Sequence, residues 1–324
     1  MTSVNGSPHD NAASAVARRH QVPSREVRAL PSGGANHVYR LGDSLVLRIP
    51  RSSSFVADLR KEVKVIPVAR AAGVRTPAVV EFDDSGSLAD VPYVVLEHVP
   101  GVDLAELRLS PSERESVYRQ VGRELARLHR VALADQDQEQ EPGNVGVVPV
   151  EDDGEDPREL VARLRAGGMI DAGAQEWLVG WLDRLSSHLQ GTSPHVLLHG
   201  DIAPQNIMVS PDSADLGGLV DWGDAVWADP AVEFAKTPLA DVVTMLKGYR
   251  EENGEEPSAG SADNAGFAWE ARILRHHLVW SLGRLVNPAA NPGERHWTAP
   301  PASRLLGLLR FYASAPEKPW RDLT

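Results

Sequence analysis

Two short apolar runs in the second half of the chain lead into polar residues, and no other feature of the sequence constrains the fold so strongly. The run 196–198 is followed by His199-Gly200-Asp201, and Asn206 stands five positions after Asp201. The run Leu219-Val220 ends at Asp221, fifteen positions after Asn206. A carboxylate base with an amide oxygen and a second carboxylate suits magnesium-dependent phosphoryl transfer, because Mg²⁺ prefers oxygen ligands. His-Gly-Asp alone would indicate an ordinary turn, so the prediction depends on the combined order and spacing.

The size and composition of the chain exclude several other classes of protein. A length of 324 residues suffices for one large domain or two joined lobes. The absence of cysteine excludes disulfides, thiolate metal ligands and a cysteine nucleophile. A formal net charge of -12 argues against a nucleic-acid partner, which would need clustered basic residues. No apolar run is long enough to span a bilayer, so we expect no membrane partner and a cytoplasmic location.

The pattern of apolar residues changes near residue 100. Before that point, short apolar runs at 38–41, 44–49 and 93–96 predict strands, and the stretch 55–72 predicts one helix between them. Beyond Gly101 the pattern is mainly helical. We therefore predict an α+β fold with a small antiparallel sheet lobe and a larger, mainly helical lobe.

Capping residues mark where several of the helices should begin. Ser110 followed by Glu113 predicts a capping box, and Asp10, Asp156 and Asp171 are candidate N-caps. Gly191 is expected to close the helix that starts at Asp171.

The predicted domain organisation has three parts. They are an N-terminal extension with a short helix over 1–25, a nucleotide-binding lobe over 26–98, and a catalytic and substrate-binding lobe over 99–324.

These motifs resemble those of the aminoglycoside phosphotransferase and choline kinase-like family, which are small-molecule relatives of the protein kinases. The resemblance is carried by His199-Gly-Asp201 with Asn206, by Asp221-Trp222 and by the segment 229–235, and it extends from about Ser32 to Ala235. It implies a two-lobed protein-kinase-like fold with the nucleotide between the lobes. Asp201 would then be the catalytic base, and Asn206 and Asp221 would hold Mg²⁺. His199 would brace the catalytic loop, and Asp229 would tie the loop below the metal site.

The resemblance also assigns nucleotide-binding residues in the first lobe. The turn Ser32-Gly33-Gly34 would let the backbone approach the phosphates of ATP or GTP, although alone it is an ordinary hairpin turn. The family places a strand lysine on the phosphates, whereas this chain has Arg48 there, with Glu62 on the following helix as its partner. The alternative interpretation of Arg48 is a surface ion pair. Backbone groups of the hinge segment, Glu97-His98-Val99, would bind the purine.

The acceptor is expected to lie against the second lobe. Antibiotic kinases of this family line the acceptor cleft with carboxylates that pair with amines, and the candidates here are Asp224, Glu233, Asp263 and Glu270. The acidic pair Glu251-Glu252 is more typical of a solvated surface. The predicted enzyme is therefore a small-molecule kinase that phosphorylates a hydroxyl of an amine-bearing compound, with an aminoglycoside or another antibiotic as the expected acceptor.

Three alternatives remain open at the level of the sequence. The same motifs fit a kinase of a primary metabolite such as choline, homoserine or a ketosamine. The arginine in place of the strand lysine would also fit a non-catalytic nucleotide-binding module. A metal-dependent hydrolase built on His195, His199 and Asp201 would require both histidines on one face of a strand, which a period of two allows.

Overall fold

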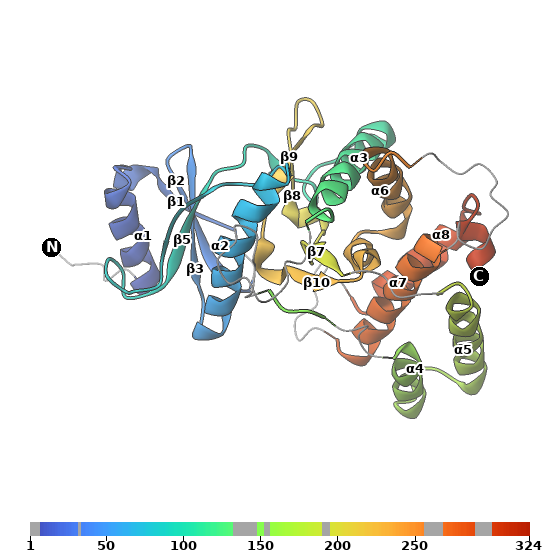
Figure 1. Cartoon of the computed structure of the whole chain (residues 1–324). Coiled ribbons are helices and arrows are strands. Elements are labelled where there is room, and N and C mark those ends of the chain that lie inside the picture. Colours follow the sequence, from blue (N-terminus) through green and yellow to red (C-terminus); the bar gives the residue numbers. More distant parts are fainter. Residues whose placement is uncertain are drawn as a thin grey trace, which may run out of the picture.

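A computed structural model of the chain describes residues 7–31, 34–131, 148–151, 156–189, 195–255, 268–288 and 300–324. It contains a sheet with flanking helices at one end and a mainly helical part at the other, with short strands between them (Figure 1). Within the described ranges, no helix combines the length and the apolar character that crossing a bilayer would require.

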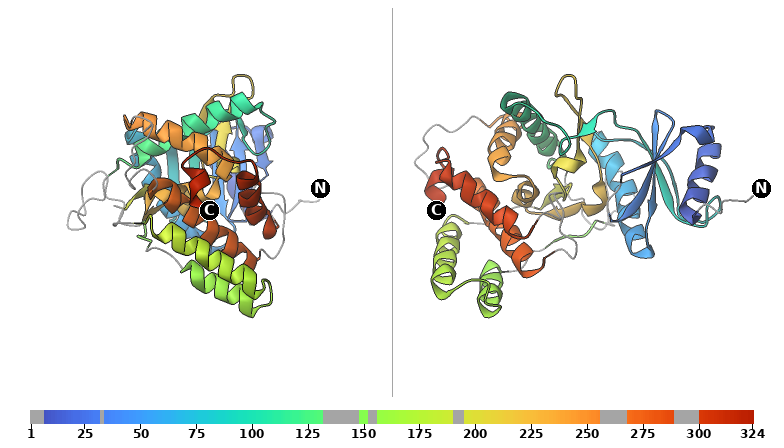
Figure 2. Two further views of the ribbon diagram at one scale, coloured as in Figure 1. Left: turned by 90° about the vertical axis from the view of Figure 1, so that its right-hand side faces the viewer. Right: turned by 180° about the vertical axis from the view of Figure 1, so that it is seen from behind.

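The N-terminal sheet has five antiparallel strands in the order β1-β2-β3-β5-β4. Helix α2 (Val56–Ala71) covers the face toward the helical part, and α1 (Pro8–Arg19) covers the other face (Figure 2, right). The strands are β1 (Val27–Leu30), β2 (Asn36–Leu41), β3 (Leu45–Pro50), β4 (Val79–Asp83) and β5 (Tyr93–Glu97).

Strand alternation explains the two faces of this sheet. In β5, Tyr93 and Val95 belong to the core under α1, while Val94 and Leu96 belong to the core that includes α2. In β3, Leu47 and Ile49 are buried under α1. The alternation therefore turns Arg48 to the face that carries α2, where the candidate site lies.

Helix α1 packs against the N-terminal sheet, whereas the sequence interpretation placed it in an extension over 1–25. Its N-cap is Ser7, whose side chain accepts from the Asp10 N–H, so the predicted cap at Asp10 was wrong by three positions. Val16 is fully buried against the sheet, and Tyr39 donates to the Asp10 carboxylate at 2.8 Å. Asp10 thus stands in the first turn, where a carboxylate favours the helix N-terminus.

The helical part begins at α3, and its predicted caps are confirmed. Ser110 and Glu113 form the capping box, while Asp156 and Asp171 cap the next two helices; Gly191 lies outside the described residues. The helices are α3 (Pro111–Leu128), α4 (Pro157–Ala166), α5 (Ala172–Ser186), α6 (Leu239–Glu252), α7 (Ala268–Val286) and α8 (Ala302–Ala313).

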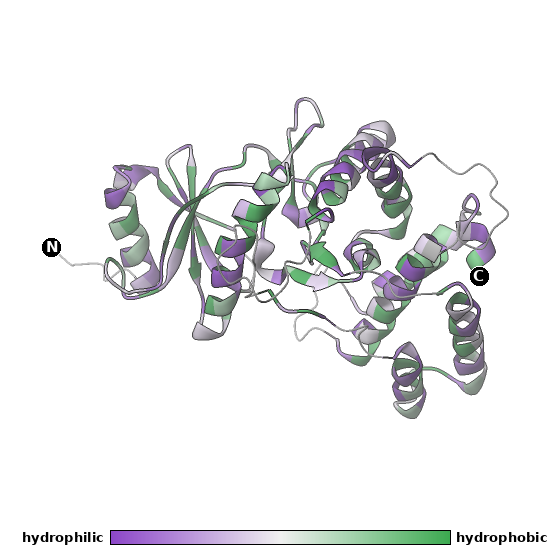
Figure 3. Ribbon diagram, in the orientation of Figure 1, coloured by the Kyte–Doolittle hydropathy of each residue, from purple (hydrophilic) through white to green (hydrophobic). Residues whose placement is uncertain are grey.

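Short strands lie between the N-terminal sheet and the helices. They form two small sheets, β7 with β10 and β6-β8-β9, and the apolar residues of β7 and β10 are visible near the centre of Figure 3. Both predicted apolar runs are strands here, β7 and β9. The bounds are β6 (Val102–Asp103), β7 (Val196–Leu198), β8 (Ile207–Val209), β9 (Leu216–Leu219) and β10 (Val226–Ala228).

Candidate active site

The loop from His199 to Asn206 leaves β7 and holds Asp201 beside Asn206. The Asn206 side-chain amide donates to the Asp201 carboxylate at 2.7 Å and to the Asp201 backbone carbonyl at 2.9 Å. Gly200 has φ of +80°, and a Cβ there would lie 2.1 Å from the Asp224 carbonyl oxygen, so only glycine fits this turn. The local sequence therefore fixes both the turn and the side-chain pair that follows it.

His199 and Trp222 form the buried support of this loop. The Asp201 N–H donates to His199 Nδ1 at 3.2 Å, and His199 Nε2 lies 3.1 Å from the Val220 carbonyl oxygen. Because one ring nitrogen accepts and the other donates, these contacts fit a neutral imidazole. The Trp222 ring lies 4.4 Å from the His199 ring. This position matches the bracing role expected for His199.

A buried carboxylate in the segment Pro230–Lys236, here called the anchor segment, holds the same loop from below. Glu233 accepts from the backbone N–H groups of His199 at 2.7 Å and Gly200 at 3.0 Å. Burial raises the pKa of Glu233, but contacts with His129 and His199 outweigh this effect, so the pKa is lowered.

The expectation that Asp229 ties the loop below the metal site is corrected. Asp229 pairs with Arg272 of α7 instead, and its carboxylate lies 2.9 Å from Nε of that arginine.

Asp221 lies between the two parts of the molecule and is paired with Arg48. Its backbone is left-handed, with φ of 71°. Arg48 on β3 donates from one guanidinium nitrogen to Asp221 at 2.6 Å and from another to Glu62 of α2 at 2.5 Å. Glu62 is 1% exposed, which excludes the surface ion pair considered above.

The shared guanidinium affects the two carboxylates differently. Burial raises the pKa of Glu62, and Arg48 offsets part of this effect. Burial would also raise the pKa of Asp221, but Arg48 outweighs it and holds that pKa below its usual range. Asp221 is therefore an ionised carboxylate at neutral pH.

Asn206 and Asp221 provide a donor set that fits a magnesium ion. The Asn206 amide nitrogen is used for Asp201, which leaves its carbonyl oxygen for a ligand, and Asp221 engages Arg48 through one oxygen. Within the described ranges, no cluster of three or more His, Cys, Asp or Glu could hold a metal by itself. A cation here would thus depend on phosphate oxygens and water as well, which is how Mg²⁺ is commonly bound.

The hinge segment connects β5 to the helical part. The Glu97 N–H donates to Ala78 and the His98 N–H to Ser44, at 2.9 and 2.7 Å. Among the contacts of the described residues, the Val99 N–H has no acceptor. Val99 is therefore the hinge residue with a backbone donor available for a purine.

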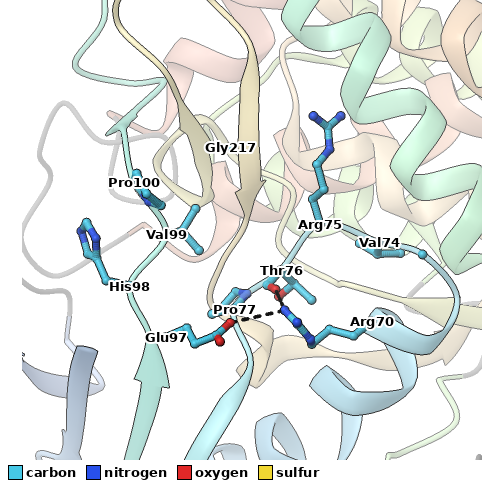
Figure 4. Close-up of a pocket in the computed structure, with 11 residues that line it drawn as sticks. Arg70, Val74, Arg75, Thr76, Pro77, Glu97, His98, Val99, Pro100 and Gly217 are labelled. Carbon is cyan, nitrogen blue, oxygen red and sulfur yellow. Dashed lines mark hydrogen bonds and ion pairs between the residues drawn. The ribbon is translucent and has the colours of Figure 1, made fainter. Parts of the chain in front are cut away.

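A cavity of about 430 Å³ lies at the same hinge segment (Figure 4). Arg70 crosses it, with Nη1 2.6 Å from the Thr76 carbonyl oxygen and 3.6 Å from the Glu97 carboxylate. Its lining includes none of the residues predicted for catalysis or metal binding.

The predicted phosphate turn is described only in part. Ser32 and Gly33 lie outside the described residues, whereas Gly34 is described and stands before β2.

The structure does not bring together the three candidate acceptor carboxylates that it describes. Glu233 braces the loop, as described above, and Glu270 is 1% exposed and pairs with Arg250 at 2.9 Å. Neither side chain is open to an amine, and the expectation for both is corrected. Asp224 is exposed but lies 3.3 Å from Lys236; Asp263 is outside the described residues.

Two cationic residues that the sequence interpretation missed, Lys236 and Arg304, lie near Asp201 together with Trp280, which the sequence offered as a flat apolar wall for the acceptor. Lys236, at the end of the anchor segment, has its amine 3.2 Å from the Asp201 carboxylate. The ring of Trp280 on α7 lies 5.2 Å from that amine and 4.7 Å from the guanidinium of Arg304 on α8. The one available signal was that Lys236, one of few lysines in the chain, directly follows the 229–235 motif.

Comparisons with known proteins agree with this geometry. The model of the "Phosphotransferase enzyme family" matches residues 26–274. An aminoglycoside 3'-phosphotransferase of Streptomyces fradiae is 30% identical over 216 residues, 63% of this chain and 72% of that protein. Acyl-CoA dehydrogenase family member 10 of Mus musculus is 26% identical over 247 residues, 72% of this chain, which spans only 22% of the length of that relative.

A similar solved structure is the GDP complex of an aminoglycoside 2'-phosphotransferase-IIIa. It has a TM-score of 0.62 at 19% identity and covers 90% of this chain and 93% of its own. This similarity confirms the predicted fold class. The family match spans most of the chain and includes Arg48, Asp201 and Asp221. The chain therefore belongs to the phosphotransferase enzyme family.

Proposed function

We propose that this enzyme transfers the γ-phosphoryl group of ATP or GTP to a hydroxyl of a small molecule, with Mg²⁺ as cofactor. The observation that carries the proposal is the continuous contact set from Glu62 through Arg48 to Asp221, with Asp201 and Asn206 joined at 2.7 Å beside it. A base, two oxygen donors and a buried cation are the components that phosphoryl transfer needs.

In the proposed reaction, a bond forms between the acceptor oxygen and the γ-phosphorus while the bond from that phosphorus to the β,γ-bridging oxygen breaks. The acceptor proton passes to Asp201, and ADP or GDP leaves. Asn206 holds Asp201 in place, and Arg48 offers positive charge on the phosphate side of Asp221. Mg²⁺, held by Asn206 and Asp221, would supply charge neutralisation at the phosphates.

The choice of nucleotide is supported by the hinge segment and by structural relatives. The Val99 N–H provides one donor of the kind that a purine ring nitrogen accepts. Neighbouring structures are described as complexes with GDP and with ATP. We propose a purine nucleoside triphosphate and expect both to be accepted.

The proposed acceptor class is a hydroxyl-bearing small molecule. The names of the relatives indicate aminoglycosides and other antibiotics, so these are the first compounds to test. Buried Glu233 and Glu270 cannot serve an amine, however, and Asp224 is paired with Lys236. The described residues thus place the cation of Lys236 at Asp201 and leave no open candidate carboxylate for an amine. A kinase of a primary metabolite is therefore the second candidate.

A nucleotide-consumption assay tests the proposal. Purified enzyme is incubated with Mg²⁺ and ATP or GTP and with aminoglycosides, macrolides, peptide antibiotics and metabolite alcohols, and products are identified by mass spectrometry. We expect at least one acceptor to gain a phosphoryl group in a reaction that EDTA stops. Absence of any phosphorylated product across the panel would contradict the proposal.

A further inference from the structure

Lys236 is held at Asp201 by anchors on both sides of it in the chain. Three positions earlier, Glu233 accepts from the backbone N–H groups of His199 and Gly200. One position later, the Thr237 hydroxyl donates to the Ile202 carbonyl oxygen at 2.8 Å. Both anchors end on the loop that carries Asp201, so the lysine and the carboxylate are fixed relative to each other. The Lys236 side chain is 17% exposed, so its amine is largely desolvated.

A second cation approaches the same place from the C-terminal helix. Arg304 of α8 donates to the Ala235 carbonyl oxygen at 3.2 Å, directly before Lys236. Helices α7 and α8 lie on the side of the loop away from the N-terminal sheet (Figure 1). Arg304 on α8 and Arg48 on β3 therefore belong to elements on opposite sides of this loop.

Trp280 connects these two cations. Its ring lies 5.2 Å from the Lys236 amine and 4.7 Å from the Arg304 guanidinium. An indole face attracts cations and also offers a flat apolar wall. The three side chains together, here called the cationic wall, give the surroundings of Asp201 two positive groups and one apolar face.

The charge of this wall is opposite to that of the chain as a whole, which carries a formal net charge of -12. Burial and the neighbouring Arg284 lower the pKa of Arg304 to about 10, whereas Asp201 acts in the opposite direction. The Lys236 amine is shared by two carboxylates, Asp201 at 3.2 Å and Asp224 at 3.3 Å, whereas Arg304 has Arg284 as a second positive charge nearby. An anion bound against Arg304 would be stabilised, and an ammonium group bound there would meet like charge.

We propose that Lys236, Arg304 and Trp280 form the acceptor subsite and that the acceptor carries an anionic oxygen group, a carboxylate or a phosphate, besides its hydroxyl. This inference rests on the proposed function and specifies its substrate class. The hydroxyl lies at Asp201, the carbon skeleton along Trp280, and the anionic group against Lys236 and Arg304. The hydroxyl oxygen then bonds to the γ-phosphorus, its proton passes to Asp201, and the nucleoside diphosphate leaves, while the anionic group stays unchanged.

Matched compounds that differ only in charge test this proposal. The probes are 6-hydroxyhexanoate, its neutral amide and 6-aminohexan-1-ol, with glycerol 3-phosphate as the phosphate arm and kanamycin as a polycation. Binding is measured by ligand-observed NMR on the whole protein with Mg²⁺ and a non-hydrolysable nucleotide, and turnover is measured in parallel with ATP and GTP. We expect a carboxylate or phosphate compound to bind about tenfold or more tightly than the amide, as a charge-assisted contact predicts. The better of the two anionic arms identifies the group.

Variants connect that preference to the cationic wall. Arg304→Gln and Lys236→Met should each raise the KM of the anionic acceptor by about tenfold, and Arg304→Lys should restore part of the loss. Arg310→Gln removes an exposed charge from the same helix and should leave the KM unchanged. The KM for nucleotide should stay within about twofold in Arg304→Gln, which separates an acceptor effect from general loss of structure.

The experiments separate a failure of the anion-subsite inference from a failure of the proposed kinase function. Preferential binding or turnover of 6-aminohexan-1-ol or kanamycin, or an unchanged anion preference in both Arg304→Gln and Lys236→Met, would overturn the inference and leave the kinase proposal standing. Tight binding of the anionic probes without phosphoryl transfer to any acceptor would overturn the proposed function and support the anion subsite.

Discussion

Arg48 shows at the scale of one residue why an arginine can stand where the family resemblance implies a strand lysine. Its planar fork reaches Glu62 and Asp221 with separate nitrogens, at 2.5 and 2.6 Å. A lysine ammonium is a point charge on a flexible stem and cannot present two donors in this fixed geometry. The arginine therefore links Glu62 of α2 to Asp221, two positions after the end of β9.

Substitution of Arg48 tests that geometry. Arg48→Ala should lower kcat/KM for nucleotide by about tenfold to a hundredfold, because phosphate charge loses a charge-assisted contact. Arg48→Lys should recover only part of the activity, since one of the two carboxylates loses its partner. Steady-state kinetics with varied nucleotide measures both, and wild-type values in Arg48→Ala would disprove the role.

The same residue has a separate effect on stability. Arg48→Ala leaves Glu62 buried without its cation, and breaking a buried pair costs about 3–5 kcal/mol. Adding Glu62→Gln should recover part of that loss, so the double variant should be less destabilised than the sum of the single variants. Denaturant unfolding of the four proteins measures the cycle, and strict additivity would show that the two residues act independently.

At the scale of elements, the anchor segment links the catalytic loop to the helices. Glu233 accepts hydrogen bonds from two backbone N–H groups, those of His199 and Gly200. Its buried carboxylate oxygen lies 3.6 Å from Nε2 of His129. The folded protein thus holds this carboxylate in its ionised form. Its effect on stability should depend on pH.

The direction of that pH dependence follows from the lowered pKa of Glu233. The ordinary value is 4.5, so stability from this group is complete above about pH 4.5 and is lost as the pH falls toward the lower folded-state pKa. Glu233→Gln should lower stability at pH 7 by about 1–3 kcal/mol and flatten the stability profile below pH 4.5. Exposed Glu159→Gln is the control. Parallel profiles for wild type and Glu233→Gln would contradict the assignment.

Helices α3 and α6 cross closely at two glycines. A Cβ on Gly122 would lie 1.9 Å from the Met245 carbonyl oxygen, and one on Gly248 would lie 2.0 Å from that of Arg119. Around this crossing, Arg114 binds Asp241 at 2.6 and 2.7 Å, and Glu251 binds Arg119 at 2.9 Å. The pair Glu251-Glu252, interpreted from the sequence as solvated, therefore joins two helices.

Alanine at this crossing should separate the helices. Gly248→Ala should destabilise the protein by about 1–3 kcal/mol, because backbone atoms on α3 must move. Gly283→Ala on α7, where a Cβ would meet nothing within 4 Å, should instead stabilise it by about 0.5–1 kcal/mol. Thermal unfolding of both variants should show shifts of opposite sign; shifts of the same sign would contradict the close crossing.

At the scale of the whole molecule, several polar contacts between described residues join the N-terminal part to the helical part. Besides the Arg48 pairs, Trp222 donates to the Thr76 hydroxyl at 2.7 Å, and Arg75 binds Glu124 of α3 at 2.8 Å. A nucleotide bound between the two parts would add further contacts. Binding should therefore stabilise the molecule as one unit.

Thermal shift measurements test this coupling. Saturating Mg²⁺ and nucleotide at about 100 times Kd should stabilise the wild type by about 2.7 kcal/mol and raise its melting temperature. Compared with each variant's own ligand-free melting temperature, which the lost contacts lower, Asn206→Ala and Asp221→Ala should show a reduced ligand-dependent shift, with Asp221→Ala the more affected because it loses a charge. Equal shifts in all three proteins would contradict the proposed metal ligands.

The sequence predicted those parts of the site that depend on short segments. The pair Asp201 and Asn206 lies within one loop, so its spacing in the sequence indicated it. The pairing of Arg48 with Glu62 was expected from the family resemblance, and the alternation of β3 turns Arg48 to the face where Glu62 lies. The sequence did not reveal that Glu233 binds the His199 and Gly200 N–H groups, or that Lys236 meets Asp201, because those contacts join segments about 35 positions apart in the chain. It also left α1 off the sheet, since much of the buried face of that helix is alanine and carries a weak apolar signal.

Replacement of Asp201 by asparagine tests the central claim most directly. With an acceptor that the wild type phosphorylates, phosphorus NMR measures product formation, while thermal unfolding and nucleotide titration check that folding and nucleotide binding persist. A positioned base contributes about 10² or more to the rate, so Asp201→Asn should lower turnover by at least that factor with the nucleotide affinity nearly unchanged. Turnover near that of the wild type in Asp201→Asn would contradict the assignment of Asp201 as the base and the mechanism built on it.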